Sequence, residues 1–276
     1  MLPIIKIKNL EVTRLIVGGN PFSGNSHVDG ETNDEMESFF STEKIKETLF
    51  RCAENGINTM QMRGDTHIQR IVREFRESGG SLNWIAQTAS ELSSFEGSIN
   101  RLLRFKIAAP DAIYLHGSAT DAFFKANETG EITRRLKILR ETGLPVGLAT
   151  HMPEIIENSE ENNWDVDFYM ACVYNLSRAD RISSAITGVD NSGEPFFDED
   201  IPVMYDRIRK TSKPCLAFKI LGASRRCGTQ DDVRFAFKEA FLNIKPTDGV
   251  IVGMFPKKRD EVQLNASYVR EALGII

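Results

Sequence analysis

Polar side chains occur at every second position near the end of the stretch NTMQMRGD, directly before an expected helix: Gln61, Arg63 and Asp65. Alternate residues of a strand share one face, and Met60 and Met62 supply the other, apolar face that would pack against helices. An interior guanidinium is costly unless an anion meets it. Arg63 therefore predicts a ligand with a carboxylate or phosphate group, with Asp65 as the alternative partner.

The same alternation places reactive side chains on the inner face of later strands. His116 ends the run DAIYLH and His151 follows PVGLAT. An imidazole near its ordinary pKa can act as an acid or a base at neutral pH. In PCLAFKIL we expect Lys219 to face inward, as a cation or as a nucleophile able to form a Schiff base. The residues of that strand expected to face outward are Leu216, Phe218 and Ile220.

Together these residues predict a site for proton transfer on a small acidic or polyhydroxylated molecule, as in an isomerase, epimerase or lyase. The expected catalytic residues are His116, His151, Lys219 and Asp65. The expected substrate-binding residues are Asn20, Gln61, Arg63 and Asn175. Two imidazoles and a carboxylate could alternatively hold a divalent metal. No HExxH motif or compact run of ligands supports that alternative, so we predict no metal site.

Eight short apolar runs alternate with longer amphipathic segments along the chain. Strands that alternate with helices of about 10 to 15 residues form parallel βαβ units. Eight such units predict a closed (β/α)8 TIM barrel, as a single domain over residues 1–276. An open, doubly wound sheet is the alternative, although no glycine-rich dinucleotide turn follows the first strand. In a barrel, the polar strand ends would meet at one rim.

Two segments stand outside this repeat. The runs IIKI and LEVTR, which precede it, predict a small β-hairpin. The stretch from Asn20 to about Phe40 is far longer than an ordinary βα connection, so we expect a lid over the barrel mouth, with a disordered insertion as the alternative. Phe22, Phe39 and Phe40 favour a packed segment.

Composition excludes several classes of partner. The 34 Lys and Arg residues and 39 Asp and Glu residues give a net charge of -5 that is spread along the chain. Such a charge does not attract nucleic acid or an anionic membrane. No apolar run approaches the roughly 20 residues of a membrane helix, and the N-terminus lacks the features of a signal peptide. We expect a cytoplasmic protein whose partner is a small-molecule substrate. The sequence does not determine the oligomeric state.

Several segments resemble the aldo/keto reductases. NLEVTRLIVGGNPFSG is similar to the N-terminal hairpin and first strand of that family. The segments ENGINTMQMRGD, IYLHGSATD, LKILRETGLPVGLATHMPE and PKKRDEVQLNASYV follow in register over nearly the whole chain. The resemblance implies a barrel whose bottom is closed by the hairpin, in a divergent relative of the family.

The chemistry that this resemblance implies is only partly supported by the residues. The family reduces carbonyl groups with NADPH through an Asp, a Tyr, a Lys and a His. Gln61 stands at the Asp position, Thr66 or Asp65 at the Tyr position and Thr88 at the Lys position. Only the His is matched, by His116. Because Gln and Thr are not general acids, the usual proton donor is missing.

The nucleotide end of the family pattern is better matched. Family members hold the adenosine phosphate with basic residues after the last strand and with an Asn in the final helix. Lys257, Lys258 and Asn265 stand at those positions. Arg225 follows the seventh strand, a region where barrels often bind phosphate. The resemblance therefore leaves NADP as a candidate cofactor, held by these residues.

Three functions remain open on this evidence. The first is a divergent enzyme whose mouth, lined by His, Arg and Lys, transfers a proton on a small anionic or sugar-like substrate. The second is an NADP-dependent oxidoreductase that protonates its substrate through His116. The third is a barrel that binds a ligand or nucleotide without turnover.

Overall fold

Eight parallel strands pair edge to edge until the sheet closes, in the order β10-β3-β4-β5-β6-β7-β8-β9. The computed structural model describes residues 2–177 and 196–275. The predicted TIM barrel is confirmed, and the open sheet is wrong. The strands are β3 (Leu15–Gly18), β4 (Thr59–Arg63), β5 (Asn83–Gln87), β6 (Ala112–Leu115), β7 (Val146–Thr150), β8 (Phe168–Cys172), β9 (Cys215–Phe218) and β10 (Gly249–Gly253).

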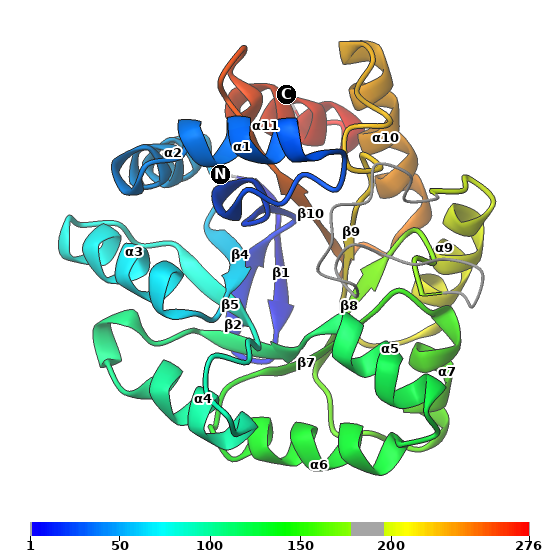
Figure 1. Cartoon of the computed structure of the whole chain (residues 1–276). Helices are drawn as coiled ribbons and strands as arrows, with labels where there is room; N and C mark the ends of the chain where they lie inside the picture. The colour runs from blue at the N-terminus through cyan, green and yellow to red at the C-terminus, as the bar shows by residue number, and fades with distance from the viewer. Residues whose placement is uncertain (1, 178–195, 276) are drawn as a thin grey trace.

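Helices cover the outside of the barrel, as Figure 1 shows looking along its interior. Most begin at a side chain that accepts a backbone N–H, such as Ser41 before α2 and Thr229 before α10. The described helices are α1 (Gly30–Phe39), α2 (Thr42–Glu54), α3 (Thr66–Glu77), α4 (Phe95–Leu103), α5 (Gly117–Lys125), α6 (Thr129–Arg140), α7 (Pro153–Glu161), α9 (Asp200–Lys210), α10 (Gln230–Asn243) and α11 (Glu261–Ala272), with short 3-10 turns η1 (Pro21–Ser23) and η2 (Lys106–Ala108).

The hairpin closes the bottom of the barrel, as the resemblance implied. Its strands β1 (Ile4–Ile7) and β2 (Leu10–Thr13) pair antiparallel. Three of its residues, Ile5, Ile7 and Val12, belong to a small apolar cluster inside the barrel. The strand residues of that cluster are Ile16, Ile85, Ala112, Tyr114, Ala149, Phe168, Met170, Leu216 and Ile251. A much larger cluster fills the space between the strands and the helices.

These two clusters test the predicted strand faces. Met60 and Met62 lie in the outer cluster, as do the alternate apolar residues of β6 and β7. The prediction was wrong for β9, where Leu216 belongs to the inner cluster and Phe218 packs against it. Alternation ends at Lys219, whose φ of 63° is left-handed, so the chain turns there and the strand pattern no longer applies.

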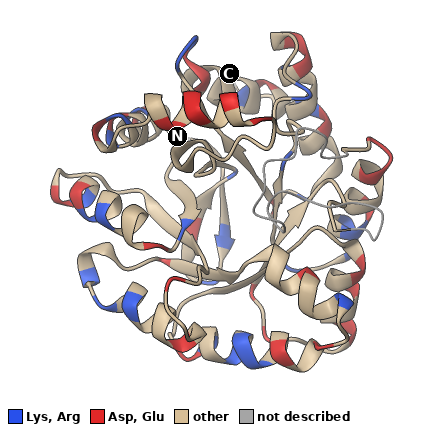
Figure 2. Ribbon diagram, viewed as in Figure 1, with Lys and Arg blue, Asp and Glu red and all other residues tan. Residues whose placement is uncertain are grey.

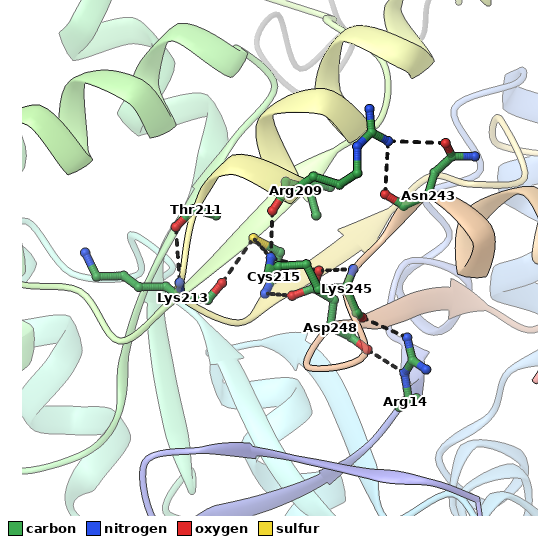
Figure 3. A network of polar contacts seen from close by, with 9 residues as sticks. Arg14, Arg209, Thr211, Lys213, Cys215, Asn243, Lys245 and Asp248 are labelled. Atoms are coloured by element: carbon green, nitrogen blue, oxygen red, sulfur yellow. Dashed lines mark hydrogen bonds and ion pairs between the residues drawn. The ribbon is translucent and has the colours of Figure 1, made fainter.

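A buried polar network holds the seam between β9, β10 and β3 (Figure 3). The fully buried carboxylate of Asp248 accepts hydrogen bonds from the backbone N–H groups of Cys215, at 2.8 Å, and Lys245, at 2.7 Å. The Lys245 ammonium lies 2.9 Å from the same carboxylate. Arg14, just before β3, donates Nε–H to the Asp248 carbonyl at 2.7 Å. These backbone hydrogen bonds and the ion pair thus join the last strands to the first at the amino-terminal side of the barrel.

Basic and acidic residues are interspersed along the outer helices of the part of the chain that Figure 2 colours. Among the described residues, no helix is long and apolar enough to cross a membrane. The predicted lack of a nucleic-acid partner stays a prediction.

The interior packing around Gly147 gives a testable prediction. A Cβ atom on Gly147 of β7 would lie 2.4 Å from Cζ of Phe168, a ring that is 0% exposed inside the barrel. Gly147→Ala should therefore lower the free energy of unfolding by about 1–3 kcal/mol in urea denaturation. Gly130→Ala is the matched control, because a Cβ there has no neighbour within 4 Å and lies in a helix. Equal effects of the two substitutions would contradict the packing.

Candidate active site

The carboxyl ends of the strands surround a cavity of about 710 Å³, which is the size of a typical small-molecule site. Most of the residues predicted for the site line this cavity: Asn20, Gln61, Arg63, His116, His151, Lys219, Lys258 and Asn265. The others do not line it: Asp65, Asn175, Arg225 and Lys257. The barrel therefore brings the predicted mouth and part of the predicted nucleotide end into one space.

His151 is held by a buried carboxylate that the sequence did not reveal. Its Nδ1 lies 2.7 Å from Oδ2 of Asp121 on α5, and the two side chains are 6% and 1% exposed. Asp121 also accepts hydrogen bonds from the hydroxyls of Thr150 and Ser177, both at 2.6 Å, and from the His151 backbone N–H. A carboxylate can only accept hydrogen bonds, so Nδ1 of His151 carries the hydrogen in this contact. Nε2 has no hydrogen-bond partner in the described part of the chain.

His116 lies at the end of β6, where it begins α5. Its backbone N–H donates to the Thr88 hydroxyl at 3.0 Å, so the residue at the family's Lys position supports the histidine backbone. The pKa of His116 is lowered to about 4, mainly by burial and further by the proximity of His151 and Arg63. The imidazole is therefore neutral at pH 7, where it can donate or accept a hydrogen bond without carrying charge.

Two cations line the mouth. Arg63 is half-exposed, and its Nε lies 3.3 Å from Oδ2 of Asp65. Asp65 is also the N-cap of α3, where it accepts from the Ile68 N–H at 2.9 Å, so its roles in the structure are capping and pairing. The Lys219 ammonium lies over the Phe196 ring, 5.3 Å from its centroid. Both cations can face an anionic ligand in the cavity.

The loop after β9 carries unusual backbone geometry where it borders the cavity. Lys219, Ala223 and Ser224 have φ values of 63°, 48° and 72°, in the left-handed region that side chains other than glycine rarely adopt. All three line the cavity. Such conformations cost on the order of 1 kcal/mol each and concentrate at functional sites. The geometry therefore agrees with the position of the cavity.

A layer of hydrogen-bonded side chains lies below the histidines. Gln61 Nε2 donates to the Tyr114 hydroxyl at 2.7 Å, and that hydroxyl donates to Oε1 of Gln87 at 3.0 Å. Burial raises the pKa of Tyr114 above its ordinary value, so the phenol stays protonated. All three residues line the cavity.

The long first connection folds back over the cavity. It forms η1 and α1, so the disordered insertion is wrong, while a lid function stays a prediction. The ring centroids of Phe22 and Phe40 are 4.9 Å apart, and those of Phe39 and Phe255, which follows β10, are 5.2 Å apart. In the view of Figure 1, α1 crosses in front of α11. The connection also supplies Asn20, whose Nδ2 lies 3.2 Å from Nε2 of His27, and both residues line the cavity.

At the predicted nucleotide end, two anion-binding groups, Lys257 and the N-terminus of α11, already have carboxylate partners. The Lys257 ammonium lies 2.8 Å from Glu35 of α1. The N-terminus of α11 is capped by Asp260, which accepts from the Gln263 N–H at 3.2 Å and pairs with Arg51. These residues do not fit a phosphate group at the helix N-terminus, because the chain supplies its own negative charge there.

Other residues at that end differ in their placement. Arg225 donates to the His27 carbonyl at 3.1 Å and stacks on Phe196, so it braces the first connection. Asn265 is 4% exposed and lines the cavity, and its side chain has no hydrogen bond within the part of the chain that the structure describes. Asn175 is 9% exposed, and its backbone N–H donates to Asp200 at 3.0 Å.

No group of three or more His, Cys, Asp or Glu side chains within residues 2–177 and 196–275 is arranged to hold a metal ion. The alternative set of His116, His151 and Asp65 is not such a group. Asp121 instead occupies Nδ1 of His151, which removes one possible metal ligand atom.

Sequence reasoning missed Asp121, Tyr114 as a site residue, Gln87 as the inward choice at the end of β5, and the cavity position of His27. One feature of the sequence could have indicated Asp121: it is an acidic residue within two turns of His116, on a helix that packs on the barrel. Gln87 and Tyr114 share a rung of the barrel, since their Cα atoms are partners across β5 and β6. His27 reaches the cavity because the first connection folds over it.

No protein-family model matches the chain, and no curated protein sequence matches it. Solved structures do match. An aldo-keto reductase from Bacillus halodurans in its holo form is 11% identical with a TM-score of 0.57, and the match covers 99% of this chain and 96% of that one. An aldo-keto reductase from Brucella melitensis is 11% identical with a TM-score of 0.53, over 100% and 92% of the two chains. The chain has an aldo/keto reductase-like barrel fold.

The same fold is found with other chemistry. A dihydropteroate synthase from Xanthomonas albilineans, in complex with indole-2-carboxylic acid and 6-chloroguanine, is 12% identical with a TM-score of 0.53, over 100% of this chain and 99% of that one. At these identities the likeness concerns the fold alone. The activity has to be argued from the residues of the site.

The lowered pKa of His116 predicts a pH-dependent stability. As pH falls from 7 to 5, the unfolded chain takes up a proton at this imidazole, whose ordinary pKa is 6.5, whereas the folded chain does so only near pH 4. Unfolding therefore becomes easier, and wild type should lose about 2 kcal/mol more of its unfolding free energy than His116→Asn over this range. Urea titrations of both proteins at the two pH values measure the difference. Parallel losses in the two proteins would contradict the burial of the ring.

Proposed function

We propose that this protein is an enzyme that moves a proton at a carbon next to a carbonyl group, in a small anionic or polyhydroxylated substrate, as an isomerase, epimerase or lyase does. The observation that carries this proposal is the Asp121–His151 pair in the cavity wall. With Nδ1–H donated to the carboxylate, Nε2 is the basic atom of the neutral ring. A histidine oriented in this way is typical of general bases.

In the proposed step, Nε2 of His151 removes the proton from carbon and later returns it to the substrate. The imidazolium that forms in between is stabilised by Asp121. Negative charge moves to the carbonyl oxygen, where the cations Arg63 and Lys219 in the same cavity would stabilise it. His116, uncharged at neutral pH, can donate a hydrogen bond to that oxygen without competing for the proton.

Reduction with NADP is the second candidate. The Asn265 amide in the cavity wall supports a ligand at that end. The carboxylates at the N-terminus of α11 and beside Lys257 oppose a phosphate there. A barrel that binds without turnover is the third candidate, and it requires no base.

Hydrogen exchange tests the proton transfer without knowledge of the product. Wild-type protein in D2O should catalyse deuterium incorporation beside the carbonyl of at least one of dihydroxyacetone, glyceraldehyde, hydroxypyruvate and dihydroxyacetone phosphate, measured by proton NMR. His151→Gln should lower the rate by about 10²- to 10⁴-fold, because the base is lost. His67→Gln, an equivalent change at an exposed histidine outside the cavity, should leave the rate unchanged. Exchange that is absent, or indifferent to His151→Gln, would refute the proposal.

A calorimetric titration with NADPH tests the reductase alternative. Micromolar binding that weakens in Asn265→Ala would favour a nucleotide-dependent oxidoreductase. We expect no heat up to millimolar NADPH, because carboxylates of the chain already pair with Lys257 and cap the N-terminus of α11.

A further inference from the structure

A donor and an acceptor are presented side by side at the floor of the cavity by Gln61 and Gln87. The two residues lie on the neighbouring strands β4 and β5 and contact the same hydroxyl, that of Tyr114 on β6. A phenol hydroxyl has one hydrogen to donate. Because this buried hydrogen needs an acceptor, the carbonyl oxygen of one amide receives it while the other amide gives its N–H to the phenol oxygen.

This reciprocity fixes what the floor offers to a ligand. As the hydrogen bonds stand, Gln61 turns its carbonyl oxygen away from Tyr114 and Gln87 turns its NH2 group away. Within the described part of the chain, neither of these outer groups has a hydrogen-bond partner, and both residues line the cavity. Reversing both amides would exchange the two roles without changing their number. In either arrangement the floor presents one free carbonyl oxygen and one free NH2 group.

The partner of such a pair is a ligand with a donor beside an acceptor. A hydroxyl group next to a carbonyl group has this pattern, since the hydroxyl donates to the glutamine oxygen and the carbonyl accepts from the glutamine NH2. Tyr114 is two residues before His116, so it is the next inward-facing residue toward the bottom of the barrel. The Cα atoms of Gln87 and Arg63 are partners across β4 and β5. A carbonyl held there would be within the environment of the histidines and the cations that the proton transfer uses.

We propose that Gln61, Tyr114 and Gln87 form a recognition site for adjacent hydroxyl and carbonyl groups. The substrate of this enzyme is then an α-hydroxy carbonyl compound. The proposal rests on the proposed function, to which it adds the substrate class. Tyr114 is a positioning residue here, because it acts by fixing the orientation of the two amides. Gln61 and Gln87 are the residues that determine specificity.

A pair of ligands that differ by one hydroxyl group tests this recognition site. Dihydroxyacetone phosphate has a free hydroxyl next to its carbonyl, and hydroxyacetone phosphate lacks it, while both keep the phosphate that Arg63 and Lys219 can attract. Wild type should bind the hydroxylated ligand about tenfold more tightly, the effect of one well-placed hydrogen bond, when dissociation constants are measured by NMR titration. Tyr114→Phe should reduce this ratio to about twofold or less, because the amides lose their fixed orientation.

Two further measurements keep the outcome interpretable. The affinity of Tyr114→Phe for inorganic phosphate should equal that of wild type, since the cations are unchanged. Gln61→Met, which removes the amide at a similar volume, should reduce the same ratio if Tyr114→Phe does not fold. Equal wild-type affinities for the two ligands, or no binding of either at millimolar concentration, would overturn the proposal.

The two proposals fail in different ways. Deuterium exchange that depends on His151 but not on the hydroxyl would refute the substrate class and leave the proton transfer standing. Selectivity for the hydroxyl that depends on Tyr114, without any exchange, would refute the proton transfer and leave a binding floor.

Discussion

A carboxylate taken out of water has to be compensated by hydrogen bonds and charge, and the mouth of this barrel is arranged around one such group. Asp121 is 1% exposed and lies on α5, while its hydrogen-bond donors come from the end of β7 and from Ser177, which follows β8. One buried group therefore connects three successive units of the barrel. It also fixes the hydrogen on Nδ1 of His151, and with it the face of the ring that a ligand can meet.

Polarity changes in layers along the barrel axis. At the bottom, the hairpin and the inner strand residues form an apolar plug that includes Ile5, Phe168 and Leu216. Above it lies the hydrogen-bonded layer of two glutamines and a tyrosine, and above that the histidines and cations of the rim. The plug fills the lower part of the barrel with apolar side chains, and the layers above it form a polar site that contains the neutral His116 and the His151 ring held by Asp121. The proposed small polar substrate would enter this site from the rim.

Much of the fold could be predicted from the sequence because strand alternation has a purely local cause. Met60 and Met62 identify the outward face of β4, and the same rule correctly gives an inward Gln61 and His116. The rule failed on β9, because it assumes an extended backbone and the left-handed turn at Lys219 breaks that assumption. Lys219 lines the cavity nonetheless, because the chain turns at this residue and not because of strand alternation.

Partners distant in sequence could not be predicted in this way. Lys257 stands where the family resemblance implies a phosphate ligand, but it meets Glu35, which the first connection brings across the barrel. Asp121 pairs with a histidine on the next unit, and only the closed barrel shows that the two meet. Asp65 is different, because an acidic residue before a helix is a local capping signal, and capping is the role that the structure gives it.

The central claim is that Asp121 holds His151 with its hydrogen on Nδ1, leaving Nε2 as the basic atom. The most direct test is a long-range nitrogen–proton correlation NMR spectrum of the His151 ring, recorded over a pH series that includes the neutral form. The account predicts a protonated Nδ1 and a bare Nε2 in the neutral ring of the wild type, and loss of this fixed tautomer in Asp121→Asn. A neutral ring protonated on Nε2 in the wild-type protein would contradict it.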